Sequence, residues 1–206
     1  EVPVSAFTDL WVRLAREFSD PTVTAFGLMN EPAKLPIAQW AEIAQTTVNA
    51  IRKTGARNLI LVSGGRWAGV HEWEKQIGDT SNANAFANFK DSLQRTYLEV
   101  HQYADSDYSG TKTDCVAAET LTTMFEAINR WARTHHQKLF LGEFGVPGTP
   151  ACFADLNAML AQTQDRAVWG GWTYWAAGSW WGNYPLSVEP MNGIDKPQMA
   201  ILKKYF

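Results

Sequence analysis

Two glutamates interrupt apolar segments of the chain and are candidates for acid–base chemistry. Glu31 follows Asn30 near the end of residues 22–32, Thr-Val-Thr-Ala-Phe-Gly-Leu-Met-Asn-Glu-Pro, and Glu143 lies within residues 139–145, Leu-Phe-Leu-Gly-Glu-Phe-Gly. Two carboxyl groups about 5–5.5 Å apart can hydrolyse a glycosidic bond with retention, because one protonates the departing oxygen while the other attacks the anomeric carbon. Like-charge repulsion and partial burial separate the pKa values of such a pair. The two segments therefore predict a carboxylate-pair glycosidase.

Both glutamates are predicted to lie at strand ends of a parallel sheet. Segments this apolar are typical of strands that are buried on both faces. Strands are predicted at residues 23–29, 58–62, 96–100, 139–141 and 171–175. Helices are predicted at residues 5–18, 37–53, 121–131, 153–160 and 197–206, and residues 68–95 are predicted as a long loop with one short helical piece. This alternation implies a parallel sheet with helices outside it, and a β/α barrel would bring Glu31 and Glu143 face to face at its mouth.

The chain is short for a complete barrel. Its 206 residues supply five predicted strands and begin with a helix, whereas an eight-stranded barrel takes about 250 residues. We expect about three further β/α units before residue 1, on a separate chain after a nick or lost by truncation. No linker or low-complexity segment divides residues 1–206. They are therefore predicted to form one partial catalytic domain, the carboxyl-terminal part of a (β/α)8 barrel.

The composition limits the partners that can be expected. The net charge is −3 and Lys and Arg form no cluster, so neither nucleic acid nor a membrane is expected to bind. Ten tryptophans, several of them in polar, glycine-rich segments, provide faces that can stack on sugar rings. No metal constellation is apparent. Asp105 and Asp107 lack the full spacing of a calcium loop and are predicted to contact sugar or to bond within their loop, and His71 is predicted to be an ordinary surface residue.

Four elements in this order resemble glycoside hydrolase family 5. They are Asn30-Glu31-Pro32 at a strand end, His101-x-Tyr103 two strands later, Glu143-Phe-Gly one strand further, and Trp175 after the last strand. The chain is most similar to the family's secreted microbial endo-β-1,4-glucanases, which carry Met-Asn-Glu-Pro, His-x-Tyr-x-Asp-Ser-Asp-x-Ser-Gly-Thr and Trp-x-Ala-Gly-Ser in the same order. The resemblance covers essentially the whole chain. It implies a (β/α)8 barrel, secretion, and hydrolysis of internal β-1,4-glucosidic bonds by double displacement without a cofactor.

The resemblance also implies roles for individual residues. Glu31 would be the acid/base and Glu143 the nucleophile. The expected substrate-binding residues are Asn30 on the sugar 2-hydroxyl, His101 beside the acid/base, Tyr103 on the nucleophile, Trp175 under the sugar at the cleavage point and Trp67 under a neighbouring glucose.

Other interpretations remain open at this point. A β-mannanase uses the same scaffold, and a catalytically silent polysaccharide-binding fragment would explain the missing strands. Trp180 and Trp181 fit either a substrate cleft or a structural lid. Two features depart from the family pattern: Ala33 stands where a larger polar residue is common, and the family's arginine and histidine on early strands have no counterpart in these residues.

The two cysteines, Cys115 and Cys152, each lie in a polar segment that is predicted to precede a helix. From their number alone, a disulfide and two free thiols are equally expected. The loop positions and the implied secretion favour the disulfide, which would contribute roughly 3 to 4 kcal/mol on the loop-entropy estimate.

Overall fold

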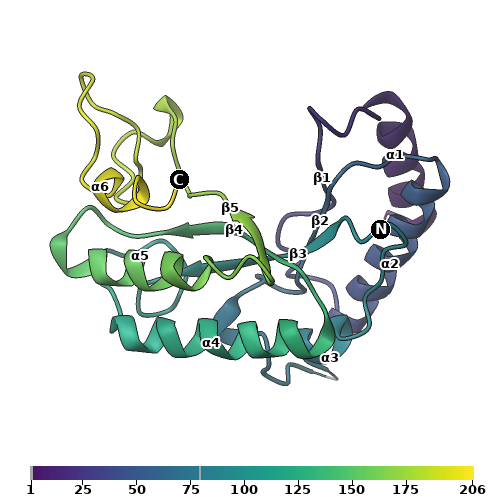
Figure 1. The fold of residues 1–206 in the computed structure, drawn as a ribbon, viewed down its shortest axis with the longest axis horizontal. Helices are drawn as coiled ribbons and strands as arrows, with labels where there is room; N and C mark the ends of the chain where they lie inside the picture. Colours follow the sequence, from purple (N-terminus) through teal and green to yellow (C-terminus); the bar gives the residue numbers. More distant parts are fainter. Residues whose placement is uncertain (1, 79) are drawn as a thin grey trace.

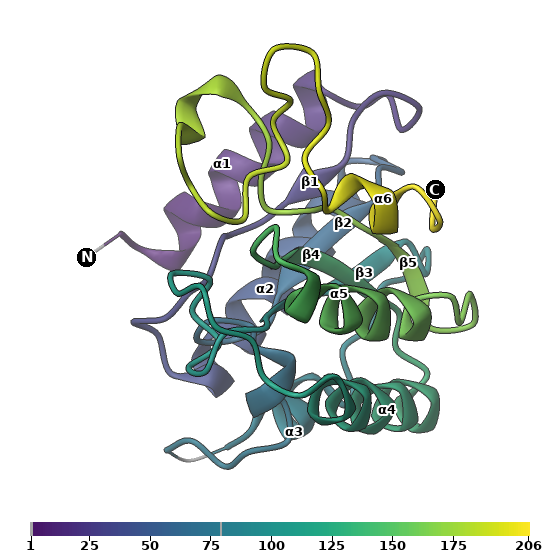
Figure 2. The ribbon, with the colours of Figure 1, turned by 90° about the vertical axis from the view of Figure 1, so that its left-hand side faces the viewer.

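The computed structural model describes residues 2–78 and 80–206 and contains a five-stranded parallel sheet. The strands follow one another across the sheet in chain order, and each pairs with the next in parallel. Figure 2 shows them side by side in the centre of the molecule. Their bounds are β1 (Phe26–Gly27), β2 (Ile60–Ser63), β3 (Thr96–Tyr103), β4 (Leu139–Gly145) and β5 (Trp169–Trp172). The predicted parallel sheet is confirmed.

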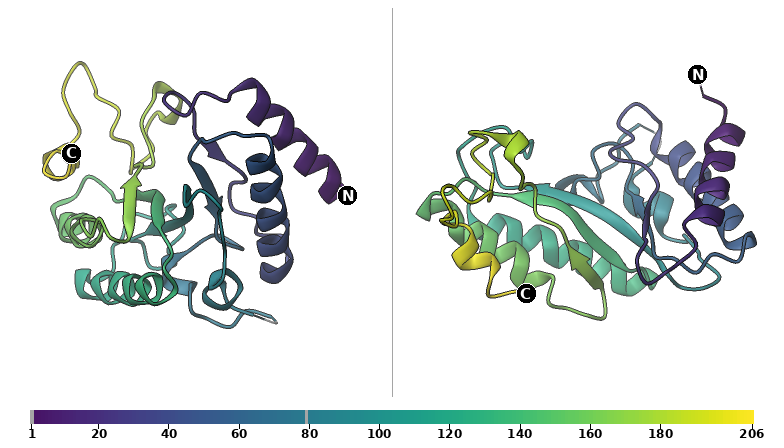
Figure 3. Two further views of the ribbon diagram at one scale, coloured as in Figure 1. Left: turned by 45° about the vertical axis from the view of Figure 1, so that its right-hand side comes forward. Right: turned by 90° about the horizontal axis from the view of Figure 1, so that it is seen from above.

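Helices connect the strands and lie outside the curved sheet. They are α1 (Val4–Glu17), α2 (Ile37–Lys53), α3 (Asn82–Phe86), α4 (Ala118–His135), α5 (Pro150–Gln162) and α6 (Met199–Leu202), with short 3-10 turns η1 (Val70–Glu72) and η2 (Ser179–Trp181). In Figure 1, α4 and α5 lie along the lower side and α1 and α2 along the right side. Both views of Figure 3 place the two chain ends on opposite sides of the molecule. Strands in chain order with helices on the outside are the arrangement of a β/α barrel.

Helix α2 shows how the sequence determines these elements. Its buried residues recur every three or four positions and include Ile37, Trp40, Ala44, Val48 and Ile51, so that one face of the helix packs on the sheet. Pro36 is the N-cap residue. Gly55, at φ 89°, adopts the left-handed conformation that commonly ends a helix. Trp40 also donates its indole N–H to the carbonyl of Ser63 at 2.7 Å, which fixes α2 to the carboxyl end of β2.

A buried ion pair holds the amino-terminal ends of β2 and β3. Arg52 of α2 donates to both carboxylate oxygens of Asp91 at 2.8 Å and to the carbonyl of Asn58 at 2.9 Å. Burial disfavours the charge of Asp91, but the bonds from Arg52 and from backbone N–H groups prevail and lower its pKa to about 2. Asp91 and Arg52 are therefore paired with each other within the scaffold.

Several predicted boundaries are wrong. The strand predicted at 23–29 is reduced to Phe26–Gly27, and Val23 is 79% exposed rather than buried; β1 lies at the sheet edge, where it pairs only with β2. Strand β3 continues through Tyr103, so His101 and Tyr103 belong to the strand. Strand β5 is Trp169–Trp172 rather than 171–175, and the closing helix is only Met199–Leu202. The segment 68–95 contains two helical pieces, η1 and α3, where one was predicted.

Candidate active site

The central strands β3 and β4 bring the candidate residues onto one face. Glu99, His101 and Tyr103 alternate along β3, and alternate residues of a strand share a face. Val100 pairs with Leu141 but His101 pairs with Glu143, so β4 contains an extra residue, Gly142. Such a bulge re-aims the side chains that follow it. The result is that Glu143 lies on the face of His101 and Tyr103.

Gly142 is required at this bulge for a steric reason. A Cβ atom at position 142 would lie 2.1 Å from a carboxylate oxygen of Glu99. The carboxylate of Glu99 occupies that space and approaches Nε2 of His101 at 3.4 Å. The bulge and the absence of a side chain at Gly142 together leave room for a third carboxylate, that of Glu99, in the site.

Glu31 reaches the site from the segment that follows β1. Its backbone has φ 42°, which non-glycine residues seldom adopt. One carboxylate oxygen of Glu31 lies 2.8 Å from Nδ1 of His101. His101 therefore links Glu31 to the central strands. It lies beside Glu31, where it was predicted.

The two candidate carboxylates are close enough for chemistry on one glycosidic bond. One side-chain oxygen of Glu31, one of Glu143 and a ring nitrogen of His101 all lie within 4.8 Å of one another. Retaining glycosidases hold their carboxyl groups about 5–5.5 Å apart and inverting ones about 6.5–9.5 Å apart. The separation fits the retaining geometry.

His101 carries a positive charge among three carboxylates. The residue is 2% exposed, and burial disfavours its charged form. Hydrogen bonds with Glu31 and Glu99 and the charge of Glu143 outweigh this effect and raise the pKa of His101 to about 9. The ring is thus protonated at neutral pH, and both of its nitrogens are donors.

Glu143 depends on its donors to be ionised. Burial raises the pKa of Glu143, the charge of His101 and the hydrogen bond from Tyr103 lower it, and the net direction is upward. The hydroxyl of Tyr103 donates to Oε2 of Glu143 at 2.7 Å, and Nδ1 of His101 lies 3.7 Å from the same oxygen. Burial raises the pKa of Tyr103 far above its ordinary value, so its hydroxyl keeps its proton and remains a donor. Because a nucleophile must be ionised, these two donors favour a nucleophilic role of Glu143.

A cavity of about 340 Å³ opens next to these groups. Trp67 lines it with about half of its surface exposed. The prediction that His71 is an ordinary surface residue is wrong, because its ring stacks on Tyr108 with centroids 4.5 Å apart and lines the cavity. The lining residues are Glu31, Trp67, Gly69, His71, His101, Tyr103, Asp107, Tyr108 and Ser109.

A larger hollow lies at the amino-terminal end of the strands but lacks paired carboxylates. Its volume is about 760 Å³, and its one lining carboxylate among the described residues, Asp91, is bound to Arg52. The smaller cavity is therefore the candidate active site.

The remaining aromatic and polar candidates lie around the site. Trp175 follows β5, and its backbone N–H donates to the carbonyl of Phe144 at 2.9 Å. Trp181 covers Trp175 edge-on, with ring centroids 5.0 Å apart, which fits a structural lid, whereas Trp180 is 91% exposed. Asn30 is exposed. Neither Asn30 nor Trp175 lines the 340 Å³ cavity.

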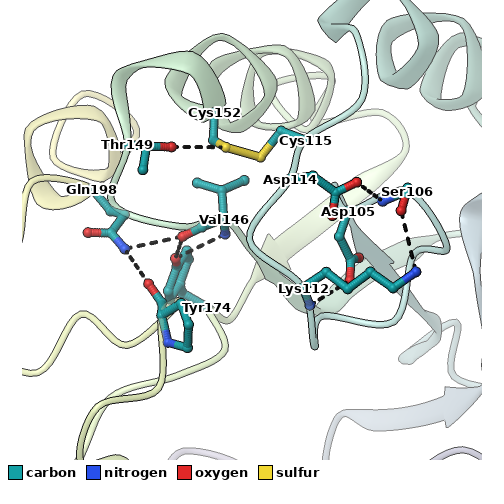
Figure 4. The surroundings of a disulfide bond; sticks show 11 residues. Asp105, Ser106, Lys112, Asp114, Cys115, Val146, Thr149, Cys152, Tyr174 and Gln198 are labelled. Atoms are coloured by element: carbon teal, nitrogen blue, oxygen red, sulfur yellow. Dashed lines mark hydrogen bonds between the residues drawn. A yellow bond between two sulfur atoms is a disulfide. The ribbon is translucent and has the colours of Figure 1, made fainter.

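The predicted disulfide is confirmed between Cys115 and Cys152. Cys115 lies in the loop after β3, but Cys152 lies in the first turn of α5 and not before it. Figure 4 shows the bond, with the hydroxyl of Thr149 donating to Sγ of Cys152 at 3.2 Å. The disulfide joins the loop that follows His101 and Tyr103 to the helix that follows Glu143.

Within residues 2–78 and 80–206, two clusters have the spacing of metal ligands. Glu31, His101 and Glu143 form one, and Cys115, Cys152 and Asp155 form the other. In the second cluster both sulfurs are committed to the disulfide. In the first, the protonated ring of His101 offers donors and would repel a cation.

The helices of residues 2–78 and 80–206 are each too short or too polar to span a bilayer.

Sequence reasoning missed three site residues, namely Glu99, His71 and Tyr108. Glu99 could have been found, because it precedes His101 by two positions and shares its strand face. His71 and Tyr108 come from two separate loops and meet only after folding.

Comparisons with known proteins identify the family. The model of the family described as cellulase (glycosyl hydrolase family 5) matches residues 2–178. The endo-β-1,4-glucanase Xac0029 of Xanthomonas axonopodis pv. citri has a structure with TM-score 0.95 and 45% identity, covering 99% of this chain and 66% of that one. XacCel5A in complex with cellopentaose gives TM-score 0.94 and 47% identity, covering 100% of this chain and 66% of that one.

Endoglucanase 1 of Robillarda sp. (strain Y-20) is 35% identical over 176 residues, which are 85% of this chain and 45% of that protein. The chain thus spans about half the length of that relative and about two thirds of the solved structures. The five strands and their helices are a part of the (β/α)8 barrel. The chain belongs to glycosyl hydrolase family 5, the cellulase family.

Proposed function

We propose that the protein is a retaining endo-β-1,4-glucanase and that residues 1–206 form the carboxyl-terminal part of its catalytic domain. The observation that supports this most directly is the approach of Glu31 and Glu143 to within 4.8 Å of each other, both of them next to Nδ1 of a protonated His101. The names of the similar proteins, endoglucanases and endo-β-1,4-glucanases, support the substrate class.

In this proposal the reaction has two steps. Glu143 attacks the anomeric carbon while Glu31 protonates the departing oxygen, which leaves a glycosyl ester on Glu143. Glu31 then takes a proton from water as that water attacks the anomeric carbon, and the ester bond to Glu143 breaks with overall retention. Tyr103 occupies Oε2 of Glu143, so the other oxygen is free to attack.

The positive charge of His101 has two uses in the first step. It stabilises the ionised form of Glu143 before attack. It also donates to Glu31, which stabilises the carboxylate that is left after proton transfer. Positive charge beside both groups therefore favours the products of the first proton transfer.

Substrate binding is assigned to residues around the cavity. Trp67 lines it and presents an exposed ring for a glucose unit. Trp175 and Asn30 are proposed to contact the sugar at the cleavage point. The complex of XacCel5A with cellopentaose supports a cello-oligosaccharide as the ligand class.

We also propose secretion, because a disulfide persists in oxidising compartments. We propose further that a polypeptide segment outside these 206 residues completes the barrel, since five strands are present here and about eight close a barrel. Intact-mass analysis of the purified protein, with a search for a copurifying fragment, tests this part of the proposal.

The decisive assay measures reducing ends released from carboxymethyl cellulose and from mannan. We expect release from the cellulose derivative, loss of release in Glu143→Gln, and normal release in Glu126→Gln, a control at an exposed position of α4. Release from mannan alone would mean that the protein is a mannanase rather than a glucanase. Binding to both polymers without release from either would contradict the enzyme assignment.

A further inference from the structure

The loop after β3 is organised around one buried carboxylate. Asp105 is 3% exposed, and its oxygens accept the backbone N–H groups of Gly110 at 3.0 Å, Thr111 at 3.1 Å and Lys112 at 3.1 Å. The hydroxyl of Ser109 donates to it as well, at 3.0 Å. Figure 4 shows the bond between the backbone N–H of Lys112 and the carboxylate of Asp105. Asp105 therefore fixes the path of residues 109–112 from inside the loop.

Gly110 transmits this constraint to Tyr103. A Cβ atom on Gly110 would lie 2.7 Å from two ring carbons of Tyr103, so the glycine backbone rests directly against the aromatic ring. The φ of Gly110 is 71°, which also favours glycine. Any side chain at this position would have to displace the ring.

Gly110 is held from its other side by the loop after β5. Its carbonyl accepts the hydroxyl of Tyr184 at 2.8 Å. Tyr184 packs on Trp181 at 5.1 Å between ring centroids, and Trp181 packs on Trp175. The position of Gly110 is thus determined by Asp105 on its N–H and by Tyr184 on its carbonyl.

We propose that Asp105 is a positioning residue which, through Gly110, holds the ring of Tyr103 where its hydroxyl bonds Glu143. This inference rests on the proposed function, in which Glu143 is the nucleophile. The bond concerned is short, at 2.7 Å, and a displacement of about 1 Å in a catalytic group can cost about 100-fold in rate. Asp105 acts at a distance and contacts no substrate in this scheme.

The consequence is measurable because the Tyr103 bond stabilises the ionised form of Glu143. The groups that face Glu143 come from three elements: Glu99, His101 and Tyr103 on β3, Glu31 after β1, and Tyr184 after β5. Losing the Tyr103 bond leaves only the charge of His101 to lower the pKa of Glu143 against burial and the two other carboxylates, which raise it. The acid limb of the kcat/KM profile should then move to higher pH.

The experiment compares Gly110→Ala with Gly193→Ala. Gly193 has φ 75° and no atom within 4 Å of an added Cβ, so it carries the same backbone penalty without the contact. We expect Gly110→Ala to lower kcat about 10- to 100-fold with a smaller change in KM, and to move the acid limb upward. Gly193→Ala should leave both unchanged.

A Tyr103→Phe background separates positioning from general damage. If Gly110 acts through the Tyr103 hydroxyl, Gly110→Ala should move the acid limb no further once that hydroxyl is gone. Asp105→Asn, which removes acceptors for the loop N–H groups, should move it in the same direction as Gly110→Ala. An unchanged acid limb in folded Gly110→Ala and Asp105→Asn, or an equal shift in the Tyr103→Phe background, would overturn the proposal.

A readout without turnover distinguishes the two proposals. Carbon-13 NMR titration of the Glu143 carboxyl, assigned with Glu143→Gln, should give a higher pKa in Gly110→Ala than in wild type. If wild type hydrolyses no glycan but this pKa rises, the proposed function fails while the positioning role of Asp105 stands. If wild type is active and this pKa does not move, only the positioning role fails.

Discussion

The centre of the sheet and its edge present the two candidate catalytic carboxylates in different ways. Glu143 is carried by β4, a strand of seven residues paired on both sides. Glu31 follows β1, a strand of two residues paired only with β2. The ladder with β3 fixes Glu143, which pairs with His101, whereas the main polar contact of the Glu31 carboxylate is with His101. The centre therefore provides a rigid nucleophile, and the edge provides an acid/base whose position depends on a side-chain bond.

His101 is the connection between these two regions. It belongs to β3 in the centre, yet its Nδ1 bonds Glu31 at the edge. Glu31 has the unusual φ of 42°, which costs of order 1–3 kcal/mol and persists only where surrounding contacts enforce it. The bond to His101 is such a contact. The separation of Glu31 and Glu143 therefore depends on both the edge and the centre of the sheet.

The largest expected effect comes from removing each carboxylate in turn. Glu143→Gln should reduce hydrolysis of an activated aryl cellobioside about 10³-fold or more, because no nucleophile remains. Glu31→Gln should spare the first step on this substrate, since an activated leaving group needs no proton, and should slow the second. Pre-steady-state kinetics of aryl alcohol release should show a burst in Glu31→Gln. Near-normal turnover of Glu143→Gln would contradict the assignment of the nucleophile.

A second effect concerns the disulfide between two segments of the centre. The Cys115→Ser/Cys152→Ser variant should lose about 3–4 kcal/mol of unfolding free energy, the loop-entropy value for the 37-residue separation. Urea denaturation of the variant and of wild type in a reducing buffer should give the same loss. A variant as stable as the oxidised protein would show that the central ladder needs no covalent support.

A third effect tests the charge of His101. Its pKa is raised from 6.5 to about 9, so its stabilising contribution is fully present below pH 6.5 and is lost as the pH rises through 9. We expect wild type to lose roughly 1–3 kcal/mol between these values relative to His101→Gln. Urea midpoints at both pH values measure the difference, with His136→Asn as a control at an exposed position. Parallel curves for wild type and His101→Gln would mean that folding does not raise the pKa of His101.

The comparison of centre and edge also explains what the sequence could predict. Helix α2 follows from its periodic apolar residues and its terminal Pro36 and Gly55, because these are local signals. The pairing of Glu31 with Glu143 followed from two polar interruptions in apolar strands. The shortness of β1 could not be predicted, since an apolar segment reads the same at an edge and in the centre.

The local details of the site required the folded chain. The bulge at Gly142 arises from pairing with β3, and without it the sequence gives no reason to place Glu143 beside His101 rather than on the opposite face. The His71–Tyr108 stack joins two loops. The role of Asp105 was left open between sugar contact and loop bonding, and the structure shows the loop bonding, because only a folded loop turns its N–H groups inward.

The smallest expected effect concerns a buried carboxylate of helix α5. Asp155 of α5 is 1% exposed, its Oδ2 has no hydrogen-bond partner among the described residues, and burial together with Glu119 raises its pKa to about 6. Because the folded pKa exceeds the ordinary 3.8, ionisation of Asp155 destabilises the fold as the pH rises through this interval. Asp155→Asn should therefore gain about 1 kcal/mol at pH 7.5 and less at pH 4.5.

Urea denaturation at these two pH values measures the gain, and the Glu119→Gln variant sharpens the test. Removing Glu119 lowers the pKa of Asp155, so that Asp155→Asn should gain less in that background. A gain that does not depend on pH would mean that packing, not charge, limits this position. A carboxylate oxygen of Asp155 lies within 4.8 Å of the disulfide sulfurs. A pH-dependent gain would therefore show that the region cross-linked by the disulfide tolerates a destabilising charge. Its rigidity would then come from the strand ladder and the disulfide rather than from uniformly favourable contacts.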